Sequence, residues 1–201
     1  MENFNIKTNR GIISEQFLKR NISDFHAACQ YISELPYKRN SVKNNTLCVF
    51  DDLGGTCSTK HAVLRKLALD NTHGEVKLIL GVFKMDSGYT WKIKNTLEKF
   101  NLNYIPEAHI YLKLDDEYFD FTNPGSNYNQ FKDKLLIEKE IEFNEIGDEK
   151  ILFHKDFLEK WISGENIPYN LEKIWNIREQ CIQDLQKSGE TENQNVHFSV
   201  V

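Results

Sequence analysis

Residues 108–122 read AHIYLKLDDEYFDFT, two runs of alternating polarity on either side of an Asp-Asp pair. This pattern predicts a β-hairpin with Asp115 and Asp116 as its loop, although Asp-Asp is a weaker turn signal than Asn-Gly. With that loop Leu114 pairs with Glu117, and alternate residues along each strand share a face. One face is then apolar and turned towards the core, and it carries Ile110, Leu112, Leu114, Phe119 and Phe121.

The opposite face of the hairpin is polar and carries the first candidate functional residues. His109 and Asp120 become diagonal neighbours there, with Cβ atoms about 7 Å apart or less. A carboxylate in that position can accept a hydrogen bond from the imidazole and hold its tautomer and orientation, as the acid of a catalytic triad does. A three-residue loop would move Asp120 to the apolar face and remove this role.

The rest of the chain predicts helices on both sides of the hairpin and additional strands. The expected helices span 14–35, 57–69, 92–100, 155–163 and 170–187, and the expected additional strands span 76–83, 135–143 and 149–153. This order of elements favours an α+β domain with a mainly antiparallel sheet and C-terminal helices. A length of 201 residues suits one domain, expected over 1–189, followed by a mobile tail over 190–201.

Composition excludes several classes of function. A net charge of −5 provides no general attraction for phosphates, which argues against a nucleic-acid binder. The longest apolar stretch, about 78–83, is far shorter than the ~18 residues that cross a bilayer, so no membrane association is expected. The first residues lack the pattern of a secretory signal, which predicts a soluble, cytoplasmic protein. The sequence provides no basis for an oligomeric state.

The cysteines differ in their local context. None forms a C-x-x-C pair, so no zinc site is predicted, and Cys29, Cys48 and Cys181 lie in apolar patterns typical of buried thiols. Cys57 instead follows Gly54-Gly55-Thr56 at the start of a predicted helix, where free N–H groups and the helix dipole favour a thiolate. Its own N–H can serve an oxyanion, and the two glycines can admit a substrate carbonyl close to the backbone. Cys57 is therefore the candidate nucleophile.

Four other residues near Cys57 bear on its role. His61, one helical turn after Cys57, is a rival base, but it lacks an evident acidic partner and a structural role is favoured. Asn40 is a weakly supported candidate for a second oxyanion donor. The adjacent carboxylates 51 and 52 would oppose thiolate formation if they pointed towards the sulfur.

Three segments together resemble the transglutaminase-like superfamily. Residues 55–64, GTCSTKHAVL, resemble its cysteine motif; 108–112, AHIYL, its histidine strand; and 118–122, YFDFT, its aspartate motif. The order also agrees, with 52 residues from Cys57 to His109 and 11 from His109 to Asp120. The resemblance covers roughly residues 25–125.

This resemblance implies a papain-like core, in which the cysteine helix packs on an antiparallel sheet that bears the histidine and the aspartate. It implies acyl transfer through a thioester, with Cys57, His109 and Asp120 as the catalytic triad and a peptide, protein or small amide as substrate. It implies no cofactor or metal, and nothing resembles the calcium loops of animal cross-linking enzymes. One departure is that many members have Trp after the motif histidine, where this chain has Ile110 and then Tyr111. The superfamily includes peptidases, amidases, deamidases and cross-linking enzymes, so no reaction is selected.

Other interpretations remain open at this stage. The same fold can serve as a binding module without turnover, or Cys57 can be a buried residue of a structural domain. The segment Gly54-Gly55-Thr56-Cys57 is also similar to arylamine N-acetyltransferases, which are longer. Those enzymes carry an arginine just before the glycines, whereas this chain has Asp52 and Leu53, so this alternative ranks lower.

Overall fold

The structure, a computed structural model, describes residues 3–42 and 45–186. Four strands form one antiparallel sheet in the order β3-β2-β1-β4. The strands are β1 Lys77–Met85, β2 Ile105–Leu114, β3 Glu117–Phe119 and β4 Leu135–Ile141. The α-helices are α1 Ile12–Leu18, α2 Phe25–Glu34, α3 Cys48–Asp51, α4 Cys57–Asp70, α5 Lys94–Lys99, α6 Asp148–Gly164 and α7 Leu171–Gln186. Short 3-10 turns are η1 Trp91–Ile93, η2 Tyr128–Gln130, η3 Lys132–Lys134 and η4 Phe143–Ile146.

The predicted α+β class, with an antiparallel sheet and C-terminal helices, is confirmed. The tail expected over 190–201 lies outside the described residues. Within 3–42 and 45–186, no helix is long and apolar enough to cross a membrane.

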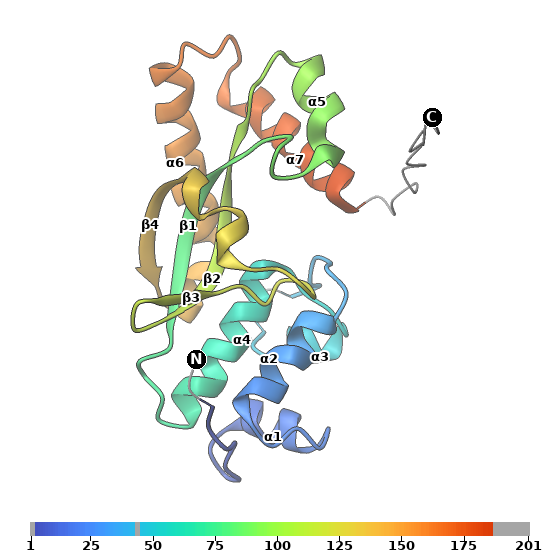
Figure 1. The fold of residues 1–201 in the computed structure, drawn as a ribbon, viewed down its shortest axis with the longest axis vertical. Helices are drawn as coiled ribbons and strands as arrows, with labels where there is room; N and C mark the ends of the chain where they lie inside the picture. The colour runs from blue at the N-terminus through green and yellow to red at the C-terminus, as the bar shows by residue number, and fades with distance from the viewer. Residues whose placement is uncertain (1–2, 43–44, 187–201) are drawn as a thin grey trace, which may run out of the picture.

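Each face of the sheet packs against its own hydrophobic cluster. Along β1, Leu80 and Val82 belong to the cluster shared with α1, α2 and α4, whereas Ile79 and Phe83 belong to the cluster shared with α5, α6 and α7. Figure 1 shows α1 to α4 gathered near one end of the long strands, with α5 and α7 towards the other. Because β1 is buried on both faces, its sequence is a continuous apolar run instead of an alternating one.

The helix predicted over 14–35 is two helices, so this prediction is wrong. The chain leaves α1 through a turn in which Asn21 takes a left-handed conformation, with φ 60°. Asp24 then caps the start of α2, because its carboxylate accepts a hydrogen bond from the Ala27 N–H at 3.0 Å. The apolar spacing continues across this break because both helices pack on the same cluster.

The predicted hairpin register is confirmed. Leu114 pairs with Glu117 across a two-residue loop in which Asp115 is left-handed, with φ 51°. The second strand is shorter than expected, because the Asp120 carboxylate accepts the Thr122 N–H at 2.9 Å and forms a local turn. The edge of β2 before Leu112, over residues 105–111, is therefore not covered by β3.

The strand predicted over 149–153 is wrong, because these residues are the first turns of α6. The apolar stretch 151–153 favours a strand locally, but Asp148 and Glu149 in the first turn suit a helix N-terminus. The helices predicted over 155–163 and 170–187 correspond to α6 and α7.

Candidate active site

Cys57 is the first residue of α4. The Thr59 hydroxyl accepts a hydrogen bond from the Thr56 N–H at 3.0 Å and stabilises the start of the helix. The N–H of a first helical residue has no partner within its helix. The thiol is 5% exposed and borders the clefts described below.

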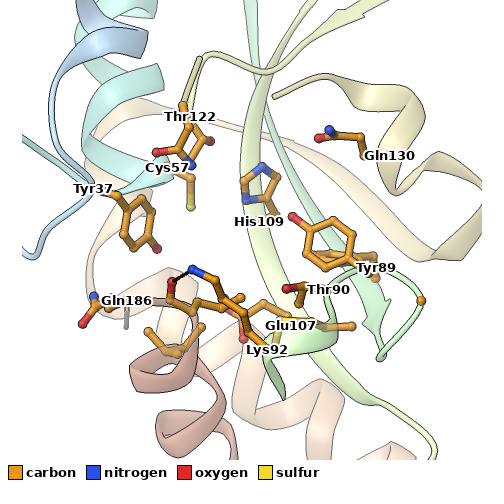
Figure 2. A pocket seen from close by; sticks show the side chains of 16 residues that line it. Tyr37, Cys57, Tyr89, Thr90, Lys92, Glu107, His109, Thr122, Gln130 and Gln186 are labelled. Carbon is orange, nitrogen blue, oxygen red and sulfur yellow. Dashed lines mark hydrogen bonds between the residues drawn. The ribbon is translucent and has the colours of Figure 1, made fainter. Parts of the chain in front are cut away.

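The glycines before Cys57 have a different use from the one the sequence predicts. The Gly55 N–H donates to the Pro36 carbonyl at 3.1 Å, and the Lys38 N–H donates to the Gly55 carbonyl at 3.2 Å. A Cβ on Gly54 would lie 2.8 Å from the Pro36 oxygen. Gly54 thus admits the protein's own segment 36–38, whereas a Cβ on Gly55 would meet Thr59 and Lys60 of α4. The backbone bonds of Gly55 place Tyr37 beside Cys57 (Figure 2).

His109 and Asp120 form the pair that the hairpin predicts. The Nε2 atom of His109 lies 2.9 Å from Oδ2 of Asp120. The other carboxylate oxygen accepts hydrogen bonds from the Thr122 N–H at 2.9 Å and from its hydroxyl at 2.5 Å. The His109 ring also packs edge-on against Phe131, with centroids 5.1 Å apart. The orientation of the imidazole is therefore fixed from two sides.

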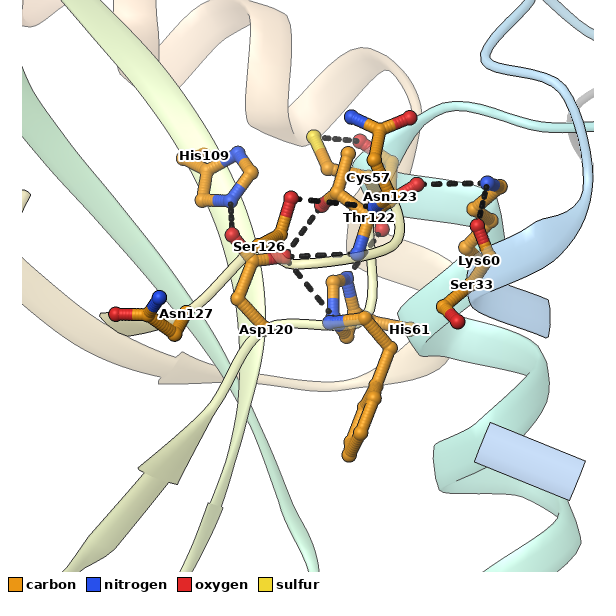
Figure 3. Close-up of polar contacts among 12 residues, drawn as sticks. Ser33, Cys57, Lys60, His61, His109, Asp120, Thr122, Asn123, Ser126 and Asn127 are labelled. Carbon is orange, nitrogen blue, oxygen red and sulfur yellow. Dashed lines mark hydrogen bonds and ion pairs between the residues drawn. The ribbon is translucent and has the colours of Figure 1, made fainter. Parts of the chain in front are cut away.

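The second ring nitrogen of His109 faces the Cys57 sulfur (Figure 3). The His109 side chain and the Ile110 backbone both act on the Cys57 thiol and help to lower its pKa. The short β3 explains this approach, because β2 has no partner strand on that side at His109 and Ile110. Cysteine, histidine and aspartate thus meet at an open sheet edge.

The electrostatics of this group favour an ion pair. Burial by itself raises the pKa of the Cys57 thiol, but the positive charges of Lys150 and His109 and the hydrogen bond from His109 hold it below its ordinary value. Burial lowers the pKa of His109, yet the negative charges of Asp120 and Cys57 raise it well above the usual range. The geometry therefore supports a thiolate beside an imidazolium.

The other three cysteines have raised pKa values, so their thiols stay protonated. Burial raises the pKa of Cys29. Burial, with the nearby Asp52 and Asp51, raises that of Cys48 to about 11, and burial with Asp184 raises that of Cys181 to about 12. Cys57 is thus the one cysteine of the chain whose thiolate is favoured.

Lys150 is a site residue that sequence reasoning missed. Its ammonium lies 3.8 Å from the Cys57 sulfur and donates to the Ser58 hydroxyl at 2.9 Å. The residue comes from the second half of the chain, 93 positions from Cys57. The strand predicted over 149–153 gave no reason to expect Lys150 at the site. A helix that begins at Asp148 places Lys150 and His154 on one face.

His61 has a structural role, although the acidic partner that the sequence did not show is present, with Oδ1 of Asp120 3.5 Å from its Nε2. Its Nδ1 atom donates to the Cys57 carbonyl at 2.8 Å, and its Nε2 atom accepts the Phe121 N–H at 2.8 Å. These two backbone partners require a neutral imidazole, and burial lowers the pKa of His61 to about 4. His61 therefore links α4 to the segment that carries Asp120.

Asn40 does not serve as an oxyanion donor. Its amide nitrogen lies within hydrogen-bonding distance of the Cys48 carbonyl, the Gly54 carbonyl and the Asp52 carboxylate, at 2.9–3.2 Å. Its oxygen accepts from Thr59 at 2.6 Å, so the side chain is fully engaged. These bonds hold the loop before Cys57, and the Asp52 carboxylate is engaged by Asn40 and Ser41.

Two clefts meet at Cys57. The larger, about 730 Å³, includes His109, Tyr89 and Lys92 (Figure 2). The smaller, about 310 Å³, includes Lys150 and Arg178. Both are bordered by Tyr37, Cys57, Glu107, Ile182 and Gln186. The nucleophile is therefore reachable from two sides.

Lys60 holds the two sides of the site together. It is fully buried, and its ammonium donates to the Leu35 carbonyl at 2.5 Å and to the Thr122 carbonyl at 2.6 Å. Burial lowers the pKa of this lysine to about 8, against the opposing effect of Asp120. One side chain thus joins the end of α2, the cysteine helix and the aspartate segment.

We expect Lys60→Met to lower the free energy of unfolding by about 2–4 kcal/mol, because each buried carbonyl left without a donor costs about 1–3 kcal/mol. Urea denaturation measures the change. The control is Lys160→Met on α6, which removes an exposed pair with Asp156 and should cost less than about 1 kcal/mol. Equal losses in the two variants would contradict the bridging role.

No group of three or more His, Cys, Asp or Glu side chains within 3–42 and 45–186 is placed to hold a metal ion. A scan against protein-family models, a search of curated proteins and a search of solved structures each found no match to this chain.

Proposed function

We propose that this protein is a cysteine-dependent acyl-transfer enzyme that acts on an amide through Cys57, His109 and Asp120. The observation that carries the proposal is the Cys57 sulfur at a helix start, facing a histidine that is hydrogen-bonded to a buried aspartate, at the junction of two clefts. We assign the chain to the transglutaminase-like superfamily, with a papain-like core, on the order and spacing of the same three residues.

The chemistry follows from the ion pair. The Cys57 thiolate attacks the carbonyl carbon of the amide, and the electron pair of the C=O bond moves to oxygen. When this tetrahedral intermediate collapses, the carbon–nitrogen bond breaks and the His109 imidazolium gives its proton to the departing amine. The resulting thioester is released by water or an amine, which His109, now neutral, deprotonates. Asp120 holds the imidazole in place and stabilises its charged form.

The clefts favour a peptide, a protein side chain or another small amide as acyl donor. A cleft of about 730 Å³ beside His109 is in the size range of small-molecule sites. It combines aromatic side chains such as Tyr89 with polar groups such as Gln130. We further propose a cytoplasmic location, because the four cysteines are free and a reducing compartment keeps Cys57 available as a thiolate.

The test is selective modification of Cys57. Iodoacetamide alkylation of the folded protein should label Cys57 first, and its rate should stay near its maximum at neutral pH. The rate should fall only as the pH passes below the lowered pKa of Cys57, whereas an ordinary thiol slows below about pH 8.5. Cys29, Cys48 and Cys181, whose pKa values are raised, serve as internal controls.

Acyl transfer itself is tested with p-nitrophenyl acetate and with peptide and glutamine-mimic probes. The wild-type protein should form a hydroxylamine-sensitive thioester on Cys57 that turns over, and Cys57→Ala should form none. Fast alkylation without any acylation would instead favour a binding module that retains the triad. Slow, unselective alkylation would leave Cys57 as a structural thiol.

A further inference from the structure

The proposed mechanism needs a group that binds the oxyanion of the tetrahedral intermediate. An oxyanion donor must lie about 3 Å from a reacting carbonyl that is itself about 3 Å from the nucleophile. The Cys57 N–H at the helix start is one such group, and Asn40 is engaged elsewhere. A second donor is therefore expected on the side of Cys57 away from His109.

Lys150 has the position that this donor requires. Its ammonium is 3.8 Å from the sulfur, so a carbonyl group attacked by Cys57 can place its oxygen against it. Lys150 borders the smaller cleft, whereas His109 borders the larger. The oxyanion and the departing amine would then lie on different sides of the sulfur.

The charges around the smaller cleft leave Lys150 available to an anion. Arg178 donates to both oxygens of Glu107 and, through Nη1, to Glu179 at 2.6 Å. Arg39 also pairs with Glu179, at 2.5 Å. Among the described residues, no carboxylate lies within 4.0 Å of the Lys150 ammonium, which donates instead to the neutral Ser58 hydroxyl. The two arginines pair directly with glutamates, whereas Glu107 acts on Lys150 only at longer range and is itself held by Arg178.

We infer that Lys150 is a catalytic residue, the cation that binds the oxyanion of the tetrahedral intermediate, and that Ser58 positions it. In the resting state the ammonium faces the thiolate. When sulfur attacks, the negative charge moves from sulfur to the carbonyl oxygen, and the ammonium is already within reach of it. The interaction is preorganised, which is what makes such donors effective. This inference rests on the proposed acyl transfer and deepens it.

The test distinguishes a role of Lys150 in oxyanion binding from a role in stabilising the Cys57 thiolate. Alkylation by iodoacetamide needs only the thiolate, whereas acylation by p-nitrophenyl acetate also forms an oxyanion. Both rates are measured for wild type and Lys150→Met at a pH on the alkylation plateau of each protein, where Cys57 is fully ionised. We expect similar alkylation rates, within a few-fold, and acylation slower by about 10²- to 10³-fold in Lys150→Met.

Three further variants complete the design. Lys150→Arg keeps the charge and should retain acylation within about tenfold of wild type, in line with a charged donor. Lys160→Met, on an exposed turn of the same helix, should change neither rate. Ser58→Ala leaves Lys150 in place and should reduce acylation by a smaller factor, which keeps the inference testable if Lys150→Met does not fold.

The possible failures are distinguishable. If acylation and alkylation by Lys150→Met both return to wild-type values on the plateau, Lys150 acts only on the thiolate and the inference is overturned, while acyl transfer stands. If the wild-type protein is alkylated at Cys57 but never acylated, the proposed function itself fails, and the inference fails with it.

Discussion

His109→Gln should slow acyl transfer from an amide by about 10³- to 10⁵-fold. The substitution removes the positive charge and hydrogen bond that hold the pKa of Cys57 down, so only a few per cent of the thiol remains ionised at pH 7. It also removes the general acid that protonates the departing amine, which is worth about 10²- to 10⁴-fold. The measurement is single-turnover acylation by a p-nitroanilide, with the alkylation rate followed against pH.

The leaving group separates the two effects. A p-nitrophenolate departs without a proton, so His109→Gln should lose only about 10- to 10²-fold on the matching ester, through the smaller thiolate fraction. His73→Gln is the control, because that side chain pairs with Glu75 at 2.7 Å and lines neither cleft at Cys57. Equal losses on ester and anilide would mean that His109 is not the acid. An unchanged alkylation profile would mean that it is not the partner of Cys57.

Asp120→Asn should slow acylation by about 10- to 10³-fold while the fold is retained. The Thr122 N–H needs an acceptor, so the asparagine oxygen stays on Thr122 and the amide nitrogen is turned towards His109. That nitrogen donates to Nε2 and drives the ring proton to the nitrogen that faces Cys57, which is the wrong tautomer for a base. The equivalent change in the serine triad costs about 10⁴-fold, and a resting thiolate depends on it less.

The measurement for Asp120→Asn is acylation by p-nitrophenyl acetate, together with the pH profile of alkylation, which should shift to higher pH as the imidazolium loses its counter-charge. Thermal unfolding verifies that the protein is folded. Asp156→Asn, which breaks an exposed pair with Lys160, should leave both rates unchanged. Unaltered kinetics in a folded Asp120→Asn protein would leave at most a Cys57–His109 pair.

The sequence was informative where one local rule decides the geometry. A two-residue loop sets the parity of a hairpin, and this predicted the approach of Asp120 to His109, although the paired register ends at Phe119 and Asp120 lies in the turn that follows. Thr56 before a run of helix-forming residues was enough to place Cys57 at a helix start. These predictions depend on contacts between residues close in the chain, so they needed no knowledge of the packing.

Local rules failed where two structures were equally compatible with the pattern. Apolar residues at 151–153 suit a strand or a helix turn, and they are helical as part of α6, which as a whole packs on β2 and α7. The spacing over 14–35 continued through the left-handed turn at Asn21, because periodicity does not detect a break between two helices on one core.

The sequence by itself determined the residue types of the candidate site, their order, and the pairing of His109 with Asp120. Only the tertiary structure brought Cys57 to the open edge of β2, gave Gly54 and Gly55 to segment 36–38, and placed Lys150 at 3.8 Å from the sulfur. These contacts join segments far apart in the chain. They arise because each face of the sheet buries a separate set of helices, and no local spacing encodes which helix packs on which face.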